Sequence, residues 1–245
     1  QKAALLFGAL MCGASMTYAD TTLFEDTFSD GATKDSWVQM NAGATTYGYD
    51  GQATIVPGAA NPSSLWHNFS DTVLQQGETL KLSFEVQMSS TTDQTSPIRF
   101  GLGYSATALV DGANGSIPVD GYLGFVPFLG NDTDPGIYWM EGPINWGNDL
   151  TAGQGSLALD NNDLYTITNS ELRTVTFEIT RDAGDSLRAV MTVNGQSTAI
   201  LGAFANSITD FKFNALSLVA PYNAGETYTF DTVKVEIVAD NALEV

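Results

Sequence analysis

The stretch that decides the fold is residues 80–88, LKLSFEVQM, in which an apolar side chain occupies every second position and a polar one stands between. Residues 174–180, TVTFEIT, repeat this alternation. A period of two turns one set of side chains toward a core and the other toward water, as in a strand of an antiparallel sheet. Both segments are therefore predicted to be half-buried β-strands.

Working outward from these two segments, we find the strand period along the rest of the chain after residue 19 and no long helical period. Further strands are expected at 22–28, 37–41, 45–56, 64–69, 98–105, 121–129, 136–141, 186–194, 197–204, 210–219 and 228–238. The best hairpin signal is Asn194-Gly195, because both residues tolerate the positive φ of a tight turn. About thirteen short strands with polar turns predict an all-β, antiparallel two-sheet sandwich, formed as one domain over residues 20–245.

The charge balance excludes some partners. The chain has 245 residues, with 9 Lys plus Arg against 28 Asp plus Glu, and a formal charge of −19. Binding to a phosphate backbone depends on Lys and Arg that release counterions, so nucleic acid is not an expected partner. Anionic membranes are disfavoured for the same reason.

The first nineteen residues have the order of a secretory signal peptide. Lys2 precedes an apolar stretch at 3–11, and small residues follow up to Ala19, after which we expect cleavage. The alternative, an N-terminal core strand or helix, leaves Lys2 and the small residues unexplained. The one cysteine, Cys12, lies in this leader, so the mature domain is expected to have no disulfide or thiolate site. The protein is therefore predicted to be secreted, in the extracellular space or at the cell surface.

Three segments carry a family resemblance. They are LFEDTF at 23–28, the hairpin around Asn194-Gly195, and YTFDTVKVEI at 228–237. Together they resemble secreted bacterial domains of the concanavalin A-like lectin/glucanase superfamily, in particular its laminin-G-like members. The resemblance implies a jelly-roll sandwich that binds glycans or forms part of a glycan-active enzyme.

Two carboxylates on the terminal strands are candidate metal ligands. Strand parity places Asp26 on the face of Phe24 and Phe28, and Asp231 on the face of Val233, so both are expected to point inward. Buried carboxylates need a proton or a cation, and hard oxygen ligands favour Ca²⁺. The resemblance implies a structural calcium between the first and last strands, held by Glu25, Asp26 and Asp231. The alternative is that each Asp meets water at a strand end or caps a backbone N–H.

A loop-rich segment at 107–163 supplies the candidate glycan surface. Sugar rings stack on aromatic side chains, and their hydroxyl groups pair with carboxylates and amides. The residues of this type that stand closest together are Tyr138, Trp139, Glu141, Asn145 and Trp146. The alternative is that Trp139 fills the core and Trp146 plugs a loop.

Two residue pairs are the candidates if the protein is an enzyme. A glycosidase needs two carboxylic acids facing each other across a sugar, and Glu85 and Glu178 lie on solvent-side positions of their strands. A polysaccharide lyase needs a base and a cation, for which His67 and Arg99 are the available set. Isolated residues of either kind are more commonly ordinary strand residues.

Three functions follow, in order of preference. The first is a non-catalytic glycan-binding or adhesive module, which the aromatic loop and the lack of a catalytic motif favour. The glycan is expected to be neutral, because the acidity of the chain opposes polyanions. The second is a polysaccharide-degrading enzyme of the same fold, either a glycoside hydrolase or a lyase. The third is a structural surface or matrix protein.

Overall fold

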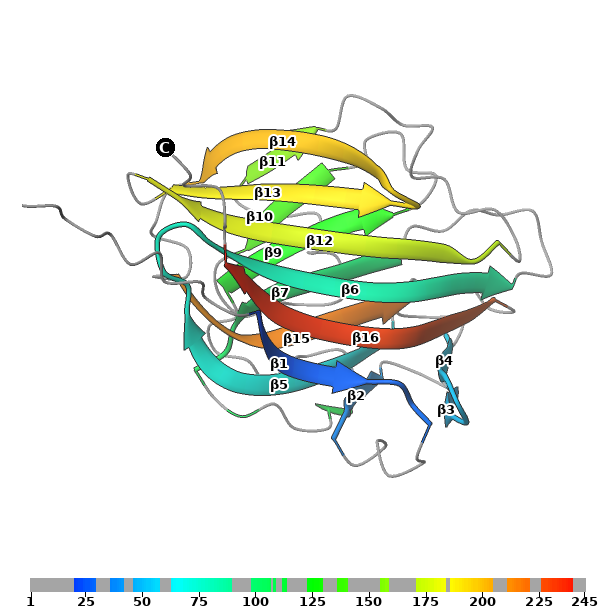
Figure 1. Cartoon of the computed structure of the whole chain (residues 1–245). Helices are drawn as coiled ribbons and strands as arrows, with labels where there is room; N and C mark the ends of the chain where they lie inside the picture. The colour runs from blue at the N-terminus through cyan, green and yellow to red at the C-terminus, as the bar shows by residue number, and fades with distance from the viewer. Residues whose placement is uncertain are drawn as a thin grey trace, which may run out of the picture.

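The protein is an all-β sandwich of two facing sheets (Figure 1). The computed structural model describes residues 20–29, 36–41, 46–57, 63–89, 98–106, 108, 112–113, 123–129, 136–140, 155–158, 171–183, 186–204, 211–220 and 226–239. The predicted leader therefore lies outside the described residues. Within these ranges there are sixteen strands, and no helix long and apolar enough to cross a membrane.

The first sheet, sheet A, has eight strands in the order β14-β13-β12-β6-β16-β4-β3, with β1 also paired to β16. Its strands are β1 (Thr21–Asp26), β3 (Thr46–Tyr49), β4 (Ala53–Val56), β6 (Glu78–Ser89), β12 (Arg173–Asp182), β13 (Ser186–Val193), β14 (Gln196–Phe204) and β16 (Thr227–Ala239). The first and last strands of the described chain thus lie side by side, as the resemblance implied. In Figure 1 they cross the front of the molecule together with β6 and β12.

The second sheet, sheet B, also has eight strands, in the order β11-β10-β9-β7-β15-β5-β2-β8. Its strands are β2 (Val38–Asn41), β5 (Ser63–Val73), β7 (Ile98–Tyr104), β8 (Gly112–Ala113), β9 (Leu123–Leu129), β10 (Gly136–Met140), β11 (Gly155–Ala158) and β15 (Lys212–Ala220). All its pairs are antiparallel except β2 with the two-residue β8.

The core between the sheets is built from the alternating positions that the sequence predicted. Phe84 of β6 and Phe177 of β12 are buried, and both approach Phe100 of β7 in the opposite sheet. The ring centroids are 5.0 Å and 6.0 Å apart, in edge-to-face geometry. Aromatic pairs prefer this arrangement because the ring edge is positive and the face negative. These contacts join the two sheets at the centre of the sandwich.

The predicted hairpin is confirmed. Asn194 and Gly195 connect β13 to β14, with φ of 48° and 77°. The Asn194 side chain accepts a hydrogen bond from the backbone N–H of Thr174 on the neighbouring β12, at 3.0 Å. The turn is therefore fixed both by its two positive-φ residues and by a contact to a third strand.

One feature of β16 departs from simple alternation. Phe230 and Val233 are both buried, although three positions separate them. The register with β6 shifts between Asp231 and Lys234, and Thr232 has a φ of 48°. This is a β-bulge, and it falls where the outer partner of β16 changes from β4 to β1. Because of it, Asp231 does not share the inward face of Val233, and that expectation is corrected.

Candidate functional site

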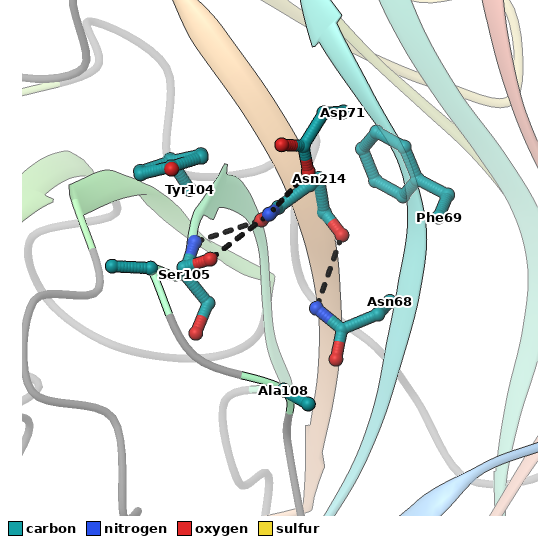
Figure 2. Close-up of a pocket in the computed structure, with 8 residues that line it drawn as sticks. Asn68, Phe69, Asp71, Tyr104, Ser105, Ala108 and Asn214 are labelled. Carbon is teal, nitrogen blue, oxygen red and sulfur yellow. Dashed lines mark hydrogen bonds between the residues drawn. The ribbon is translucent and has the colours of Figure 1, made fainter.

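An open pocket of about 260 Å³ lies at one end of sheet B (Figure 2). It straddles the end of β15, which stands between β5 and β7 in the sheet. The lining residues come from these three strands and from the chain just after β7: Asn68, Phe69, Asp71, Tyr104, Ser105, Ala106, Ala108 and Asn214. Rigid strands therefore position the side chains on three sides of the pocket.

A bulge between β5 and β15 shapes the pocket. Thr72 pairs with Phe213 and Asn68 pairs with Ala215, so residues 69–71 of β5 stand opposite Asn214 alone. Extra residues on one strand bend it and redirect its side chains. The bend places Phe69 and Asp71 on the pocket wall.

Asn214 organises the floor of the pocket. Its Oδ1 accepts a hydrogen bond from the Ser105 N–H at 2.7 Å, and its Nδ2 donates to the Ser105 carbonyl and to Asp71 Oδ1, both at 2.9 Å. The backbone ladder between β15 and β7 ends at the pair of Ala215 and Gly103, and beyond it the Asn214 side chain bonds the backbone N–H and carbonyl of Ser105. Asn214 is only 7% exposed, and a buried amide is costly unless it is hydrogen-bonded. Here both its donor and acceptor atoms are used.

Polar and apolar groups converge above this floor. Asp71 is exposed and offers its second carboxylate oxygen to the pocket, while the Asn68 amide donates to the Asn214 carbonyl at 3.3 Å. Tyr104 is half-buried and contributes aromatic surface, whereas Phe69, also on the lining, is only 8% exposed and packs in the core. The Lys212 ammonium lies 5.9 Å from the Tyr104 ring centroid. This combination suits a small ligand that has both hydroxyl groups and an apolar face.

Our sequence reasoning missed this pocket, although a signal was present. Residues 213–220, FNALSLVA, read as a buried strand, and Asn214 is a polar amide inside it. A polar side chain in such a run must find hydrogen-bond partners, and those partners mark a polar site. The partners themselves, on β5 and after β7, depend on the sheet order.

Of the predicted metal ligands, Asp26 points inward as expected. It is 4% exposed. One carboxylate oxygen accepts the Phe28 backbone N–H and the other accepts the Trp37 indole N–H, both at 2.7 Å. This is the alternative in which the Asp caps a backbone N–H, with an indole donor added. Two N–H donors thus stabilise the buried carboxylate, and the calcium ion remains a prediction.

The other two predicted metal ligands lie away from the core. Asp231 is half-buried at the β16 bulge and accepts hydrogen bonds from Gln52 Nε2 and Thr232 Oγ1, each at 3.2 Å. Glu25 is exposed and pairs in register with Lys234. Among the described residues, no three His, Cys, Asp or Glu side chains gather where they could hold a metal ion.

The structure does not bring Glu85 and Glu178 together. Glu85 pairs with Thr174 across β6 and β12, and Glu178 pairs with Lys81. The two acids are thus four residues apart along the strands, about 13 Å at the rise of a β-strand. Glycosidase carboxyl groups lie roughly 5–10 Å apart. Both acids remain half-buried positions on the outer face of sheet A.

His67 and Arg99 lie on opposite faces of sheet B. His67 pairs with Leu216 of β15. Arg99 pairs with Val219, three residues further along the same strand. An odd separation reverses the face. His67 stacks on Phe24 with ring centroids 3.8 Å apart, and its Nδ1 donates to the Ser36 carbonyl at 2.8 Å. Burial lowers the His67 pKa, against the opposing effects of that hydrogen bond and of Asp26. The pair therefore does not form a lyase site.

The predicted aromatic glycan surface remains a prediction. Tyr138 and Trp139 lie on β10, which pairs with β9 and β11 in sheet B. Their side chains, and the whole of Glu141, Asn145 and Trp146, fall outside the described part of the chain.

No protein-family model matches the chain, and no curated protein matches its sequence. Among solved structures, peanut lectin has a TM-score of 0.55 at 11% identity, over 90% of this chain and 98% of the lectin. A variant of the Emp46p carbohydrate recognition domain has a TM-score of 0.55 at 11% identity, over 87% of this chain and 94% of that domain. A carbohydrate esterase from a Shiga toxin-encoding bacteriophage has a TM-score of 0.50 at 14% identity, over 89% of this chain and 99% of the esterase. The chain therefore has the concanavalin A-like jelly-roll fold.

Proposed function

We propose that this chain is a non-catalytic glycan-binding β-sandwich and that the pocket around Asn214 is its sugar site. The observation that carries the proposal is the convergence of Asp71, Asn68 and the Tyr104 ring on one open pocket whose floor is fixed by hydrogen bonds. Such a site offers acceptors for sugar hydroxyl groups and apolar surface for the C–H face of the ring. An exported protein, as residues 1–19 predict, would meet glycans outside the cell.

The structural neighbours support a carbohydrate ligand without deciding between binding and catalysis. Two of those reported above are named as a lectin and a carbohydrate recognition domain, and the third as an esterase. Binding is favoured here because, among the described residues that line the pocket, the titratable groups are Asp71 and Tyr104, with no second carboxylate or imidazole. The aromatic residues of the 138–146 segment are proposed as a second contact surface for a longer glycan.

The test is a glycan array followed by calorimetric titration of the best-bound glycan. We expect binding by the wild type and a loss of at least about tenfold for Asp71→Ala, because the carboxylate accepts hydroxyl donors. Asp50→Ala is the matched control, since Asp50 is an exposed acid in the β3–β4 turn of the other sheet. Each bound glycan is also incubated with the protein and assayed for new reducing ends. Formation of new reducing ends would contradict the non-catalytic proposal, and absence of binding to every glycan on the array would contradict glycan binding.

A further inference from the structure

The Asp71 carboxylate in the pocket has a fixed orientation. Asp71 Oδ1 is engaged by the Asn214 amide at 2.9 Å, which fixes the carboxylate against the floor. The described residues donate no hydrogen bond to Asp71 Oδ2, and Asp71 is on the pocket lining. A carboxylate accepts hydrogen bonds and cannot donate them. A ligand group beside Asp71 must therefore be a donor, such as a hydroxyl or an ammonium group.

The described residues that line the pocket provide no positive side chain to offset this charge, since none of the eight is Lys, Arg or His. Lys212 is exposed, and its ammonium lies 5.9 Å from the ring centroid of Tyr104, outside this lining. An anionic ligand group beside Asp71 would thus meet its carboxylate at short range, without a guanidinium or ammonium group among the described lining residues. Like charges at a few ångströms repel, and partial desolvation strengthens the repulsion.

The pocket volume limits the size of the ligand. Pockets for drug-sized molecules span about 300–1,000 Å³. At about 260 Å³ this pocket lies just below that range. It is therefore matched to one sugar ring, with the rest of a glycan chain left outside.

We propose that Asp71 makes this a pocket for one uncharged sugar ring and excludes the corresponding uronic acid. The inference rests on the proposed glycan-binding function and names the class of sugar that the site takes. Asp71 is then the residue that determines specificity, with Asn214 holding its carboxylate in place. Replacing the carboxylate by an amide of the same shape removes the repulsion while keeping one acceptor oxygen.

The experiment compares matched neutral and acidic probes. Calorimetric or NMR titrations use the methyl glycosides of glucose, galactose and mannose, each paired with the methyl glycoside of its uronic acid. For the wild type we expect the best neutral probe to bind at least about tenfold more tightly than its uronide, from the repulsion of two charges near a protein surface. Higher ionic strength is expected to narrow this ratio, because salt screens exposed charges.

The variants Asp71→Asn and Asp50→Asn change the net charge equally. We expect Asp71→Asn to lose most of the preference against the uronide, and Asp50→Asn to keep it. Thermal unfolding checks that both variants remain folded. We expect that they do, because both side chains are exposed.

The outcomes separate the two proposals. Equal wild-type affinity for a sugar and its uronide would overturn the inference and leave glycan binding intact. If Asp71→Asn keeps the preference for the neutral sugar, another residue causes that preference, and the inference is likewise overturned. Binding to array glycans without binding to any single-ring probe would refute the one-ring pocket. Absence of binding in every format would overturn the proposed function itself.

Discussion

Replacing Asp26 tests what stabilises the junction between the N-terminal strand and the rest of the sandwich. Its two carboxylate oxygens accept the Phe28 N–H and the Trp37 indole N–H at 2.7 Å, and Trp37 is only 3% exposed. In Asp26→Asn one oxygen remains, so one buried donor loses its acceptor, at a cost of about 2 kcal/mol. In Asp26→Ala both donors lose their acceptor, and the expected loss of unfolding free energy is about 4 kcal/mol.

The assay is equilibrium urea unfolding at pH 7, followed by circular dichroism. Asp50→Ala replaces an exposed acid in the β3–β4 turn and is expected to stay within about 0.5 kcal/mol of the wild type. If Asp26→Ala also stays within that limit, the two hydrogen bonds do not hold the junction and the reasoning is refuted.

A chelator distinguishes this account from the calcium proposal for Glu25, Asp26 and Asp231. With the hydrogen bonds alone, the melting temperature of the wild type is expected to be the same with and without chelator. A fall that added Ca²⁺ restores, and that is absent in Asp26→Asn, would establish that a cation stabilises the carboxylate instead.

Two further predictions concern single contacts. Burial lowers the pKa of His67 below its ordinary value of 6.5, so the folded protein binds a proton at His67 more weakly than the unfolded chain does. The stabilisation is therefore complete above about pH 7 and declines as the pH falls through 6.5 toward the lower folded pKa, at no more than about 1.4 kcal/mol per pH unit. Unfolding titrations should show a shallower decline for His67→Phe, and an identical slope would contradict this. Arg181 donates to the Leu74 carbonyl at 2.8 Å and lies 3.8 Å from the Phe211 ring centroid. Arg181→Ala is expected to cost about 2 kcal/mol. Arg188→Ala, which removes an exposed ion pair, is the control and should cost under about 0.5 kcal/mol, so equal losses would refute the assignment.

Local alternation predicted the strands well because it reflects the environment of each strand by itself. Residues 80–88 and 174–180 became the centres of β6 and β12, and the Asn194-Gly195 turn joins β13 to β14. The predicted strand at 45–56 is the hairpin of β3 and β4, with a turn between them in which Gly51 has a φ of 72°. The strand β8 was not predicted, since two residues are too few to establish a period, and β11 was not predicted either.

The candidate sites were less predictable because they depend on which strands are neighbours. Alternation within each strand could not predict whether His67 and Arg99 lie on the same face of a sheet. Their pairing with Leu216 and Val219 of β15 places them on opposite faces. For an inward Asp26 the sequence suggested a cation or a capped backbone N–H, but not the indole of Trp37, eleven residues away, as a donor. Donors of this kind follow from tertiary packing and not from spacing in the chain.

A break in parity along a strand is nevertheless a signal that can be read. In β16 the positions in the core cluster change from even to odd after Phe230, and in β15 they change from odd to even after Phe213. At each break stands a polar residue, Asp231 in one and Asn214 in the other. Each break coincides with a bulge, in which the extra residue lies on β16 itself at Asp231, whereas the extra residues opposite Asn214 lie on β5.

The two bulges differ in the strands beside them. Beside Asp231, β16 keeps its pairing with β6, and β4 and β1 follow one another along its other edge. Beside Asn214, the pairing of β15 with β7 has already ended, and three residues of β5 face Asn214 alone. Asn214 therefore uses its side chain to bind the backbone of Ser105, and the pocket beside it is lined by Asp71 and Tyr104 among others. The pocket thus lies where a bulge coincides with the end of a ladder, because there the backbone groups beyond the ladder need side-chain partners.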